Sequence, residues 1–346
     1  MKAVLFEEHG DRSVIDYGEV PDPEPGDDEV LVDVKAGALN HLDVWTRGGL
    51  PGIDLEMPHV PGSDGAGEVV EVGEDVTRFS PGDRVALTAG VWCGDCEFCR
   101  HGEESMCVRF HIIGEHTPGV HSELAAIPER NLVPVPEGVD WETAAAAPLV
   151  FQTAWRMLID RAEVREGETV LVLGASGGVG HAAVQIADHA GADVIATAST
   201  EEKREYAREI GADETVDYTE VDFSEAVREL TDGRGVDVVV DHIGGETWGK
   251  SIKSLRKGGR LVTCGATGGF NPETDVRRLF WNQLELIGST MATPGQVDDV
   301  LELVWDGTLE PRIRDVLPMS ETARAHEMIE EREGFGKVVV VPDSEL

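Results

Sequence analysis

Strand-like and helix-like segments alternate regularly from about residue 168 to residue 290. The apolar run 168–175 leads into a helix-like segment that ends near residue 191, and three further strand–helix pairs follow. Two more strand-like runs, GRLVTCG and ELIGST, complete the series. Strand–helix units of this length predict a doubly wound parallel sheet, so the fold class is α/β.

Residues 1 to about 150 have a different pattern. Short strand-like runs such as MKAVLF, EVLVDVKAGAL and GEVVEVG are separated by turn-rich stretches such as PDPEPGDD and RGGLPG. This rhythm predicts a compact β-rich domain of barrel-like character. Beyond Pro294 we expect one helix and a last strand, KVVVVP.

A glycine-rich turn joins the first strand to the first helix of the alternating region. Glycine lets the backbone turn tightly and approach a pyrophosphate, and the free N–H groups of the following helix attract its charge. A strand before and a helix after are the context that a dinucleotide-binding turn requires. We therefore expect the cofactor to contact Gly174, Ser176, Gly177, Gly178, Val179 and Gly180.

The end of the second strand bears on which nicotinamide cofactor binds. NAD-binding sheets usually carry an acid there to hold the ribose 2′-hydroxyl, whereas this strand ends in TAST without one. Ser199 and Thr200 can hydrogen-bond a 2′-phosphate, and Lys203 and Arg204 follow. The sequence favours NADP(H). NAD(H) remains the alternative, in which the two cations are surface charges paired with nearby glutamates.

Four of the five cysteines are concentrated in residues 91–108. Cys93, Cys96, Cys99 and Cys107 follow the spacing C-x2-C-x2-C-x7-C in a short polar loop. Four thiolates close a tetrahedral shell around zinc and leave no position for a substrate, so we expect one structural Zn²⁺. The fifth, Cys264, is expected to be a small buried side chain.

The chain is strongly acidic. Asp and Glu number 67 against 29 Lys and Arg, which gives a formal net charge of −38. This charge opposes binding to nucleic acid or to anionic membranes, and its even spread indicates adaptation to a salt-rich cytosol, where screening removes self-repulsion. No apolar run is long enough to span a membrane and the N-terminus has no signal-peptide pattern, so we expect a cytoplasmic protein.

Together these features resemble the medium-chain dehydrogenase/reductase superfamily, which includes zinc alcohol dehydrogenases and quinone or enoyl reductases. The likeness includes the opening KAV and PEPGDDEVLVDV, the GDRV turn, the cysteine lobe, GASGGVG and the closing GKVVVV. It implies a GroES-like catalytic domain over 1–151, a Rossmann domain over 152–292, and a segment 293–346 that returns to the catalytic domain. It also implies a homodimer or homotetramer.

The resemblance breaks down at the positions of the catalytic zinc. Alcohol dehydrogenases of this superfamily carry a cysteine where this chain has Asn40, and Gly-His-Glu where it has Gly62-Ser63-Asp64. Their third ligand falls near Leu149. Asn, Ser and Leu are poor zinc ligands, although Asp43, Asp64, His41 and His59 are near enough in sequence to build a replacement site.

The zinc-free quinone oxidoreductase branch fits these positions better. Its members resemble this chain at Asn40 and Asp43, and at Lys203 and Tyr218 for the NADPH phosphate, although most of them lack the cysteine lobe. We expect Asn40 to donate a hydrogen bond to the substrate carbonyl, His41 or His59 to supply a proton, and Asp43 to orient them.

The expected activity is NAD(P)H-dependent reduction of an activated double bond, in an enoyl thioester or enone, or of a quinone, by hydride transfer without catalytic zinc. The alternative is a zinc-dependent alcohol dehydrogenase with atypical ligands. A non-enzymatic binding protein, a third class, is disfavoured by the intact glycine turn and, for nucleic acid, by the charge. The residues do not identify the small-molecule substrate.

Overall fold

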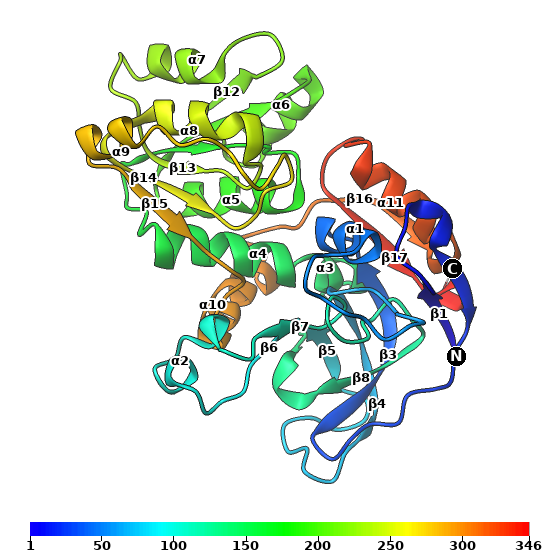
Figure 1. The fold of residues 1–346 in the computed structure, drawn as a ribbon. Coiled ribbons are helices and arrows are strands. Elements are labelled where there is room, and N and C mark those ends of the chain that lie inside the picture. The colour runs from blue at the N-terminus through cyan, green and yellow to red at the C-terminus, as the bar shows by residue number, and fades with distance from the viewer. Residues whose placement is uncertain (346) are drawn as a thin grey trace. The chain divides into compact units, whose positions relative to one another are not determined.

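The computed structural model describes residues 1–345 and divides the chain into two compact units (Figure 1). One unit comprises Met1–Leu149 and Thr293–Leu346, and the other comprises Val150–Ala292. The sequence predicts domain boundaries between residues 151 and 152 and between residues 292 and 293, and the structure has them between 149 and 150 and between 292 and 293. No helix within residues 1–345 has the length and apolarity that a membrane crossing requires.

The unit over Val150–Ala292 is built on a six-stranded, all-parallel sheet in the order β12-β11-β10-β13-β14-β15. The predicted doubly wound sheet is confirmed, and its strand order reverses between β10 and β13, which is where such sheets bind ligands. The strands are β10 (Thr169–Val172), β11 (Asp193–Ala198), β12 (Glu214–Asp217), β13 (Val236–Val240), β14 (Leu255–Thr263) and β15 (Glu285–Gly288). The helices are α4 (Pro148–Trp155), α5 (Gly178–His189), α6 (Glu201–Glu209), α7 (Phe223–Leu230), α8 (Trp248–Ser254) and α9 (Val276–Asn282).

The core of this unit lies between the sheet and its helices. Leu171, Val239 and Leu261 come from three adjacent strands and are completely buried, together with Val227 of α7. These strands read as continuous apolar runs because both faces of a parallel sheet are covered.

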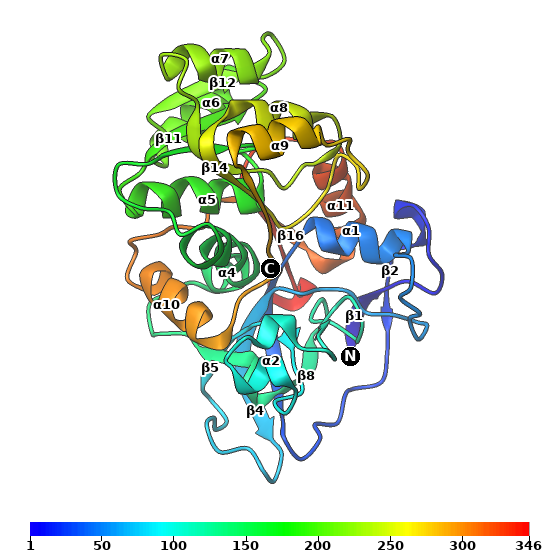
Figure 2. The same ribbon diagram turned by 60° about the vertical axis from the view of Figure 1, so that its left-hand side comes forward.

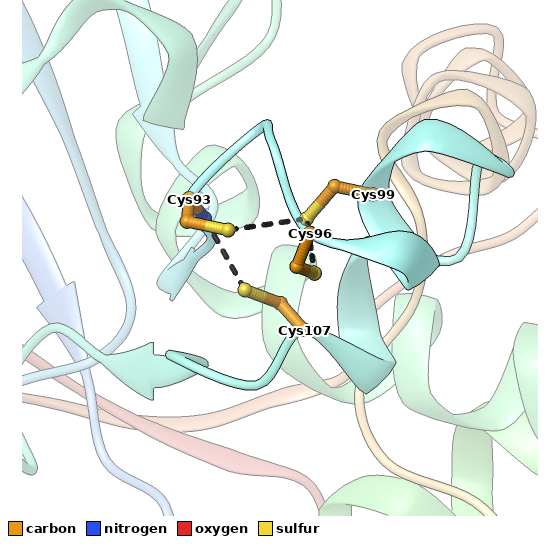
Figure 3. A group of neighbouring side chains, drawn as sticks. All are labelled: Cys93, Cys96, Cys99 and Cys107. Atoms are coloured by element: carbon orange, nitrogen blue, oxygen red, sulfur yellow. Dashed lines mark hydrogen bonds between the residues drawn. The ribbon is translucent and has the colours of Figure 1, made fainter.

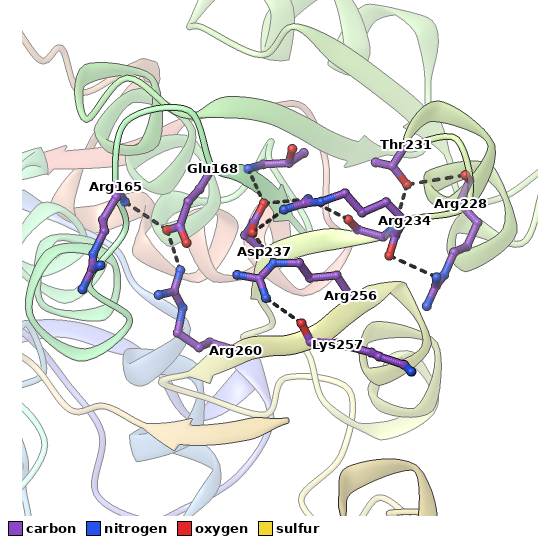
Figure 4. Close-up of polar contacts among 11 residues, drawn as sticks. Arg165, Glu168, Arg228, Thr231, Arg234, Asp237, Arg256, Lys257 and Arg260 are labelled. Carbon is purple, nitrogen blue, oxygen red and sulfur yellow. Dashed lines mark hydrogen bonds and ion pairs between the residues drawn. The ribbon is translucent and has the colours of Figure 1, made fainter. Parts of the chain in front are cut away.

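A network of charged side chains lies where β10, β13 and β14 begin (Figure 4). Asp237 is buried on β13 and forms ion pairs with Arg234 and Arg256, and it accepts a 3.0 Å hydrogen bond from the backbone N–H of Thr169. Arg260 of β14 pairs with Glu168 at 2.5 Å. The network therefore joins the beginnings of three neighbouring strands.

The other unit contains a seven-stranded sheet in the order β16-β17-β3-β4-β5-β9, with β8 also paired to β3. Two short hairpins, β1 with β2 and β6 with β7, complete its strands. The strands are β1 (Lys2–Leu5), β2 (Asp16–Glu19), β3 (Glu29–Ala38), β4 (Gly65–Val72), β5 (Arg84–Leu87), β6 (Gly90–Val91), β7 (His111–Ile112), β8 (Leu124–Pro128), β9 (Leu132–Pro134), β16 (Ile313–Pro318) and β17 (Lys337–Val341). The helices are α1 (His41–Gly48), α2 (Glu97–Arg100), α3 (Trp141–Ala146), α10 (Pro294–Trp305) and α11 (Thr322–Glu330).

The C-terminal segment completes this sheet. β17 pairs antiparallel with β3, so Val339 lies opposite Ala38, and α11 packs against α1 (Figure 2). The segment holds more than the one helix and one strand that we expected, because β16 and α11 also form there. The helical stretch from Trp141 to Arg161 is interrupted. It divides before Pro148, whose ring nitrogen carries no hydrogen to donate, and it ends in a π-helical turn, Arg156–Arg161.

Candidate active site

The glycine-rich turn lies between β10 and α5, as predicted. Gly174 has φ +59°, a conformation that side chains disfavour, and its N–H donates to Thr197 Oγ1 at 3.2 Å. A Cβ on Gly180 would come within 2.1 Å of the Gly174 carbonyl oxygen, so both glycines are required for the turn to lie against the helix. Gly177 caps α5, and the first N–H groups of this helix are suited to hold phosphate. Ser176, Gly178 and Val179 belong to the same turn and to the start of the helix.

A buried aspartate that we did not predict organises the loop after β13. Asp241 accepts hydrogen bonds from the backbone N–H groups of Ile243 and Gly244, each at 2.9 Å, and from Ser251 Oγ at 2.7 Å. The loop lies against the glycine turn, since a Cβ on Gly174 would be 3.3 Å from the ring of His242. The DHIGG sequence carries the only signal for this role, an Asp before a glycine pair.

The residues predicted to select the cofactor lie around the start of α6. Thr200 caps this helix, because its hydroxyl accepts the N–H of Lys203 at 3.3 Å. Arg204 forms ion pairs with Glu201, at 2.6 Å, and with Asp217. Ser199 lies between β11 and α6, and the Tyr218 side chain is exposed. Of the two cations that we considered, Arg204 is therefore already paired with acids.

The four predicted cysteines converge (Figure 3). One sulfur from each of Cys93, Cys96, Cys99 and Cys107 lies within 4.8 Å of every other. A tetrahedral zinc with bonds of about 2.3 Å would need sulfur–sulfur distances of about 3.8 Å, and Cys93 and Cys99 are 3.9 Å apart. Backbone N–H groups of Cys93 and Arg109 also point at Cys107 Sγ, each at 3.3 Å. The cluster therefore fits a closed four-thiolate metal site.

Asn40 belongs to a buried polar cluster that β17 completes. The Lys337 ammonium donates to Asn40 Oδ1 at 2.6 Å and to Asp64 Oδ2 at 3.1 Å, and its side chain is 3% exposed. Asn40 Nδ2 donates to the same Asp64 oxygen at 2.8 Å and is 3.4 Å from the Ala38 carbonyl. The remaining Asp64 oxygen accepts the N–H of Leu149 at 2.9 Å. We name Asn40, Asp43, Asp64 and Lys337 the Lys337 cluster.

Asp43 joins this cluster through the backbone of Asn40. Its Oδ2 accepts the Asn40 N–H at 2.7 Å, which fixes the chain at the start of α1. Burial raises the pKa of Asp43 to about 6. Burial also raises the pKa of Asp64, although the charge of Lys337 and the hydrogen bond from Asn40 act in the opposite direction.

The two predicted histidines are not part of the Lys337 cluster. His41 is exposed on the first turn of α1, with its ring centroid 6.0 Å from that of Trp45. His59 is buried, and its Nε2 lies 3.0 Å from the Gly114 carbonyl, so this nitrogen is used in a structural contact. The proposed proton-donor role of either histidine remains a prediction.

Two groups near the cluster were missed by the sequence analysis. His121 is completely buried, neither ring nitrogen has a hydrogen-bond partner within residues 1–345, and burial lowers its pKa to about 4. Its ring fills the space beside Gly37 and Gly62, where a Cβ would come within 2.7 Å. Glu115 is also buried, and burial together with the charge of Asp43 raises its pKa to about 7. Neither residue belongs to a motif with a local signature.

The positions aligned with catalytic-zinc ligands do not fit a divalent metal. The oxygen of Asn40 accepts from a cation, the hydroxyl of Ser63 donates to the Ile113 carbonyl at 2.7 Å, and Leu149 contributes only its backbone N–H. A divalent ion near Asp64 would also meet the Lys337 ammonium, which already neutralises that carboxylate. We therefore derive no chemical step through a metal at this place.

Two family models match the chain. Residues 26–137 match the alcohol dehydrogenase GroES-like domain, and residues 178–306 match the zinc-binding dehydrogenase model. Among relatives, an acryloyl-coenzyme A reductase of Metallosphaera sedula is 35% identical over 98% of this chain and 99% of its own. A quinone oxidoreductase of Pseudomonas aeruginosa is 35% identical over 99% of both chains.

Solved structures show the same similarity. An NAD-dependent alcohol dehydrogenase has a TM-score of 0.95 and 45% identity, with 99% of both chains covered. The 2-octenoyl-CoA carboxylase reductase CinF, in complex with NADP and 2-octenoyl-CoA, has a TM-score of 0.90 and 29% identity, and it covers 99% of this chain and 87% of that one.

Proposed function

The chain is an oxidoreductase of the medium-chain dehydrogenase/reductase superfamily, and from that premise we propose that it reduces an activated double bond with NADPH. The proposed substrate is an enoyl thioester or an enone, or else a quinone. The relatives named as acryloyl-coenzyme A reductase and quinone oxidoreductase support this class. The observation that carries the proposal is the Lys337 cluster, which has an ammonium and an amide where alcohol dehydrogenases need zinc ligands.

The chemistry explains why this difference selects the substrate. Bound NADPH would supply the hydride. Reduction of a simple ketone builds a full alkoxide charge, which a metal stabilises well. Hydride addition to a conjugated carbonyl spreads the charge into an enolate, for which hydrogen-bond donors suffice. In this proposal the second Nδ2 hydrogen of Asn40, whose contact with the Ala38 carbonyl is long at 3.4 Å, turns to the substrate carbonyl oxygen. Lys337 and Asp64 hold the amide, and Asp43 holds the backbone of Asn40.

The preference for NADP(H) is part of the proposal. It is supported by the lack of an acid at the end of β11, by Ser199 at that end, and by Lys203 in the first turn of α6. The neighbour solved with NADP is consistent with it, whereas the neighbour named as NAD-dependent favours the alternative. A comparison of kcat/KM for the two cofactors decides between them, and Lys203→Ala should reduce the value for NADPH alone.

A substrate screen in high salt tests the proposed function. Oxidation of NADPH is followed with enoyl-CoA esters, quinones and aldehydes, and zinc is counted on the same sample. One zinc per chain and turnover of enoyl-CoA esters or quinones support the proposal. Two zincs per chain, or turnover restricted to aldehydes and alcohols, support the zinc-dependent alcohol dehydrogenase. Failure to bind either nicotinamide cofactor would make the chain a non-enzymatic protein.

The role of Asn40 has its own test. Asn40→Ala removes the amide that faces Asp64 and should lower kcat for NADPH oxidation about 100-fold, with the KM for NADPH little changed. An unchanged rate would show that Asn40 does not serve the carbonyl.

We also propose that the chain forms a homodimer or homotetramer through the unit that contains β15. Phe270, Val276, Phe280 and Trp281 are 62% to 75% exposed, and β15 is the last strand of its sheet. Large exposed apolar side chains beside an open strand edge suit a second copy of the chain. Sedimentation in high salt should give a dimer or tetramer that Trp281→Glu weakens, and a monomeric wild type would refute this proposal.

A further inference from the structure

The Lys337 cluster and its surroundings hold more acid than base. Asp43, Asp64 and Glu115 are buried carboxyl groups; the Lys337 ammonium pairs with Asp64, and the charge of Asp43 acts on Glu115. Ionised carboxylates in a buried environment each need a partner, so the three do not all remain charged at neutral pH. At least one of them therefore holds a proton.

The hydrogen bonds identify which carboxyl holds it. Asp64 accepts from Lys337, Asn40 and Leu149, and Asp43 accepts from the backbone of Asn40. Glu115 has neither an ammonium nor a backbone N–H, and within residues 1–345 its only charged or polar side-chain partner is His116, whose Nδ1 is 3.2 Å from its Oε2. The pKa order agrees, since Glu115 is raised to about 7 and Asp43 to about 6.

Glu115 is held firmly beside the cluster. It lies in the turn between Ile113 and Thr117. Two side chains hold the backbone just before it: Ser63 Oγ donates to the Ile113 carbonyl at 2.7 Å, and His59 Nε2 lies 3.0 Å from the Gly114 carbonyl. The Glu115 side chain is 9% exposed, while that of His116 is 34% exposed. Glu115 is therefore buried, whereas its partner His116 is partly exposed to water.

We propose that Glu115 is the general acid of the reaction. The inference rests on the proposed function and applies to its α,β-unsaturated carbonyl substrates, of which we take the thioesters as the test case. Hydride adds to the β-carbon, and the electron pair of the C=C bond moves toward the α-carbon and the carbonyl. The O–H bond of Glu115 then breaks as a C–H bond forms at the α-carbon. The resulting carboxylate takes a proton from solvent, so that NADPH, one proton and the enoyl thioester give NADP⁺ and the saturated thioester.

Glu115→Gln is the decisive variant, because the amide has the shape of the protonated acid without a proton to transfer. We expect kcat with acryloyl-CoA to fall about 100-fold or more, with the KM for NADPH within about twofold of wild type. The exposed Glu137→Gln is the matched control and should keep full activity. A Glu115→Gln enzyme with wild-type kcat overturns the proposal, while a wild type inactive toward every unsaturated thioester overturns the proposed function first.

The stereochemistry of the product gives a second readout. In D2O the wild type should place one deuterium on a single face of the α-carbon, which NMR of the product detects. Without the acid, water protonates the enolate, so Glu115→Gln should give both faces. Slow turnover by Glu115→Gln that keeps the wild-type face selection would contradict a proton transfer from Glu115.

The pH dependence isolates the titration of Glu115 from any effect on catalysis. Because its pKa is raised in the folded state, Glu115 contributes stability at low pH that is lost as pH rises through about 7. The Tm of Glu115→Gln relative to wild type should therefore increase between pH 5 and pH 8. A constant difference would mean that Glu115 is already ionised at pH 5. The titratable groups that act on Glu115 or on its partner His116 are Asp43, His116 and His111.

Discussion

At the scale of single residues, Lys337 connects groups that are far apart in the chain. Its ammonium joins Asn40 and Asp64, which are 297 and 273 positions away. An isolated buried charge is strongly unfavourable, and it becomes tolerable only when partners of opposite charge and good geometry surround it. The pair is therefore better evidence for a defined polar arrangement at the site than for added stability.

Replacement of Lys337 tests this pairing. Lys337→Met leaves Asp64 buried without its cation and should lower the free energy of unfolding by about 3–5 kcal/mol. The loss should be greater at pH 8 than at pH 5, because the pKa of Asp64 is raised and its proton is released as pH rises. Denaturant unfolding measures both effects. The exposed Lys257→Met is the control, and the double variant with Asp64→Asn should recover much of the loss.

At the scale of secondary-structure elements, one short segment depends on metal rather than on an apolar core, and the beginnings of three strands carry a charged network in addition to their apolar core. The lobe 91–108 contains only the four-residue helix α2 and a 3₁₀ turn, and Met106 and Val108 are exposed. The beginnings of β10, β13 and β14 are joined through Asp237. The strand beginnings also include the buried Val236 and Leu255, so the contacts of Asp237 add to apolar packing there.

Removal of metal should affect the lobe alone. A strong chelator should extract about one zinc per chain and lower Tm, because four thiolates without metal neither bury apolar surface nor remain close together. Mild chelation that leaves the lobe intact should not change turnover. Cys264→Ser is the control and should keep the full zinc content. Loss of turnover with the lobe still folded would favour a catalytic metal instead.

Asp237→Asn tests the strand network. Burial alone would raise the pKa of Asp237, but hydrogen bonds from Arg234, Thr169 and Arg256 hold it well below the usual range. The stability that it contributes is therefore present above the ordinary pKa of an aspartate and is lost as pH falls further into the acid range. We expect a loss of about 2 kcal/mol at pH 7. The exposed Asp193→Asn should cost little, and equal losses for the two variants would refute the role of the network.

At the scale of the whole molecule, the net charge of −38 sets the response to salt. Many of the cations are already used in ion pairs, among them Arg12, Arg204, Arg314 and Arg324. The excess acids therefore repel one another across the surface, and ions in solution reduce that repulsion.

We expect Tm to rise steeply between 0.1 M and 2 M KCl. The Debye length falls from about 10 Å to less than about 3 Å over this range, which removes most repulsion between separated carboxylates. Scanning calorimetry measures the shift, with sucrose of equal osmolality as the control for solvent exclusion. A Tm that is flat or falls with KCl would contradict adaptation to high salt.

The sequence alone determined the features that depend on neighbours in the chain. The alternation of strands and helices, the turn at Gly174–Gly180 and the four lobe cysteines each lie within a short stretch, so spacing and residue type were sufficient to predict them. The tertiary structure decided how Asn40 is used, because its partners come from β17 and from the segment before β4. It also placed Glu115 beside Asp43 and buried His121. No local pattern encodes such contacts, since they join segments far apart in the chain, as when the C-terminal strand pairs with β3.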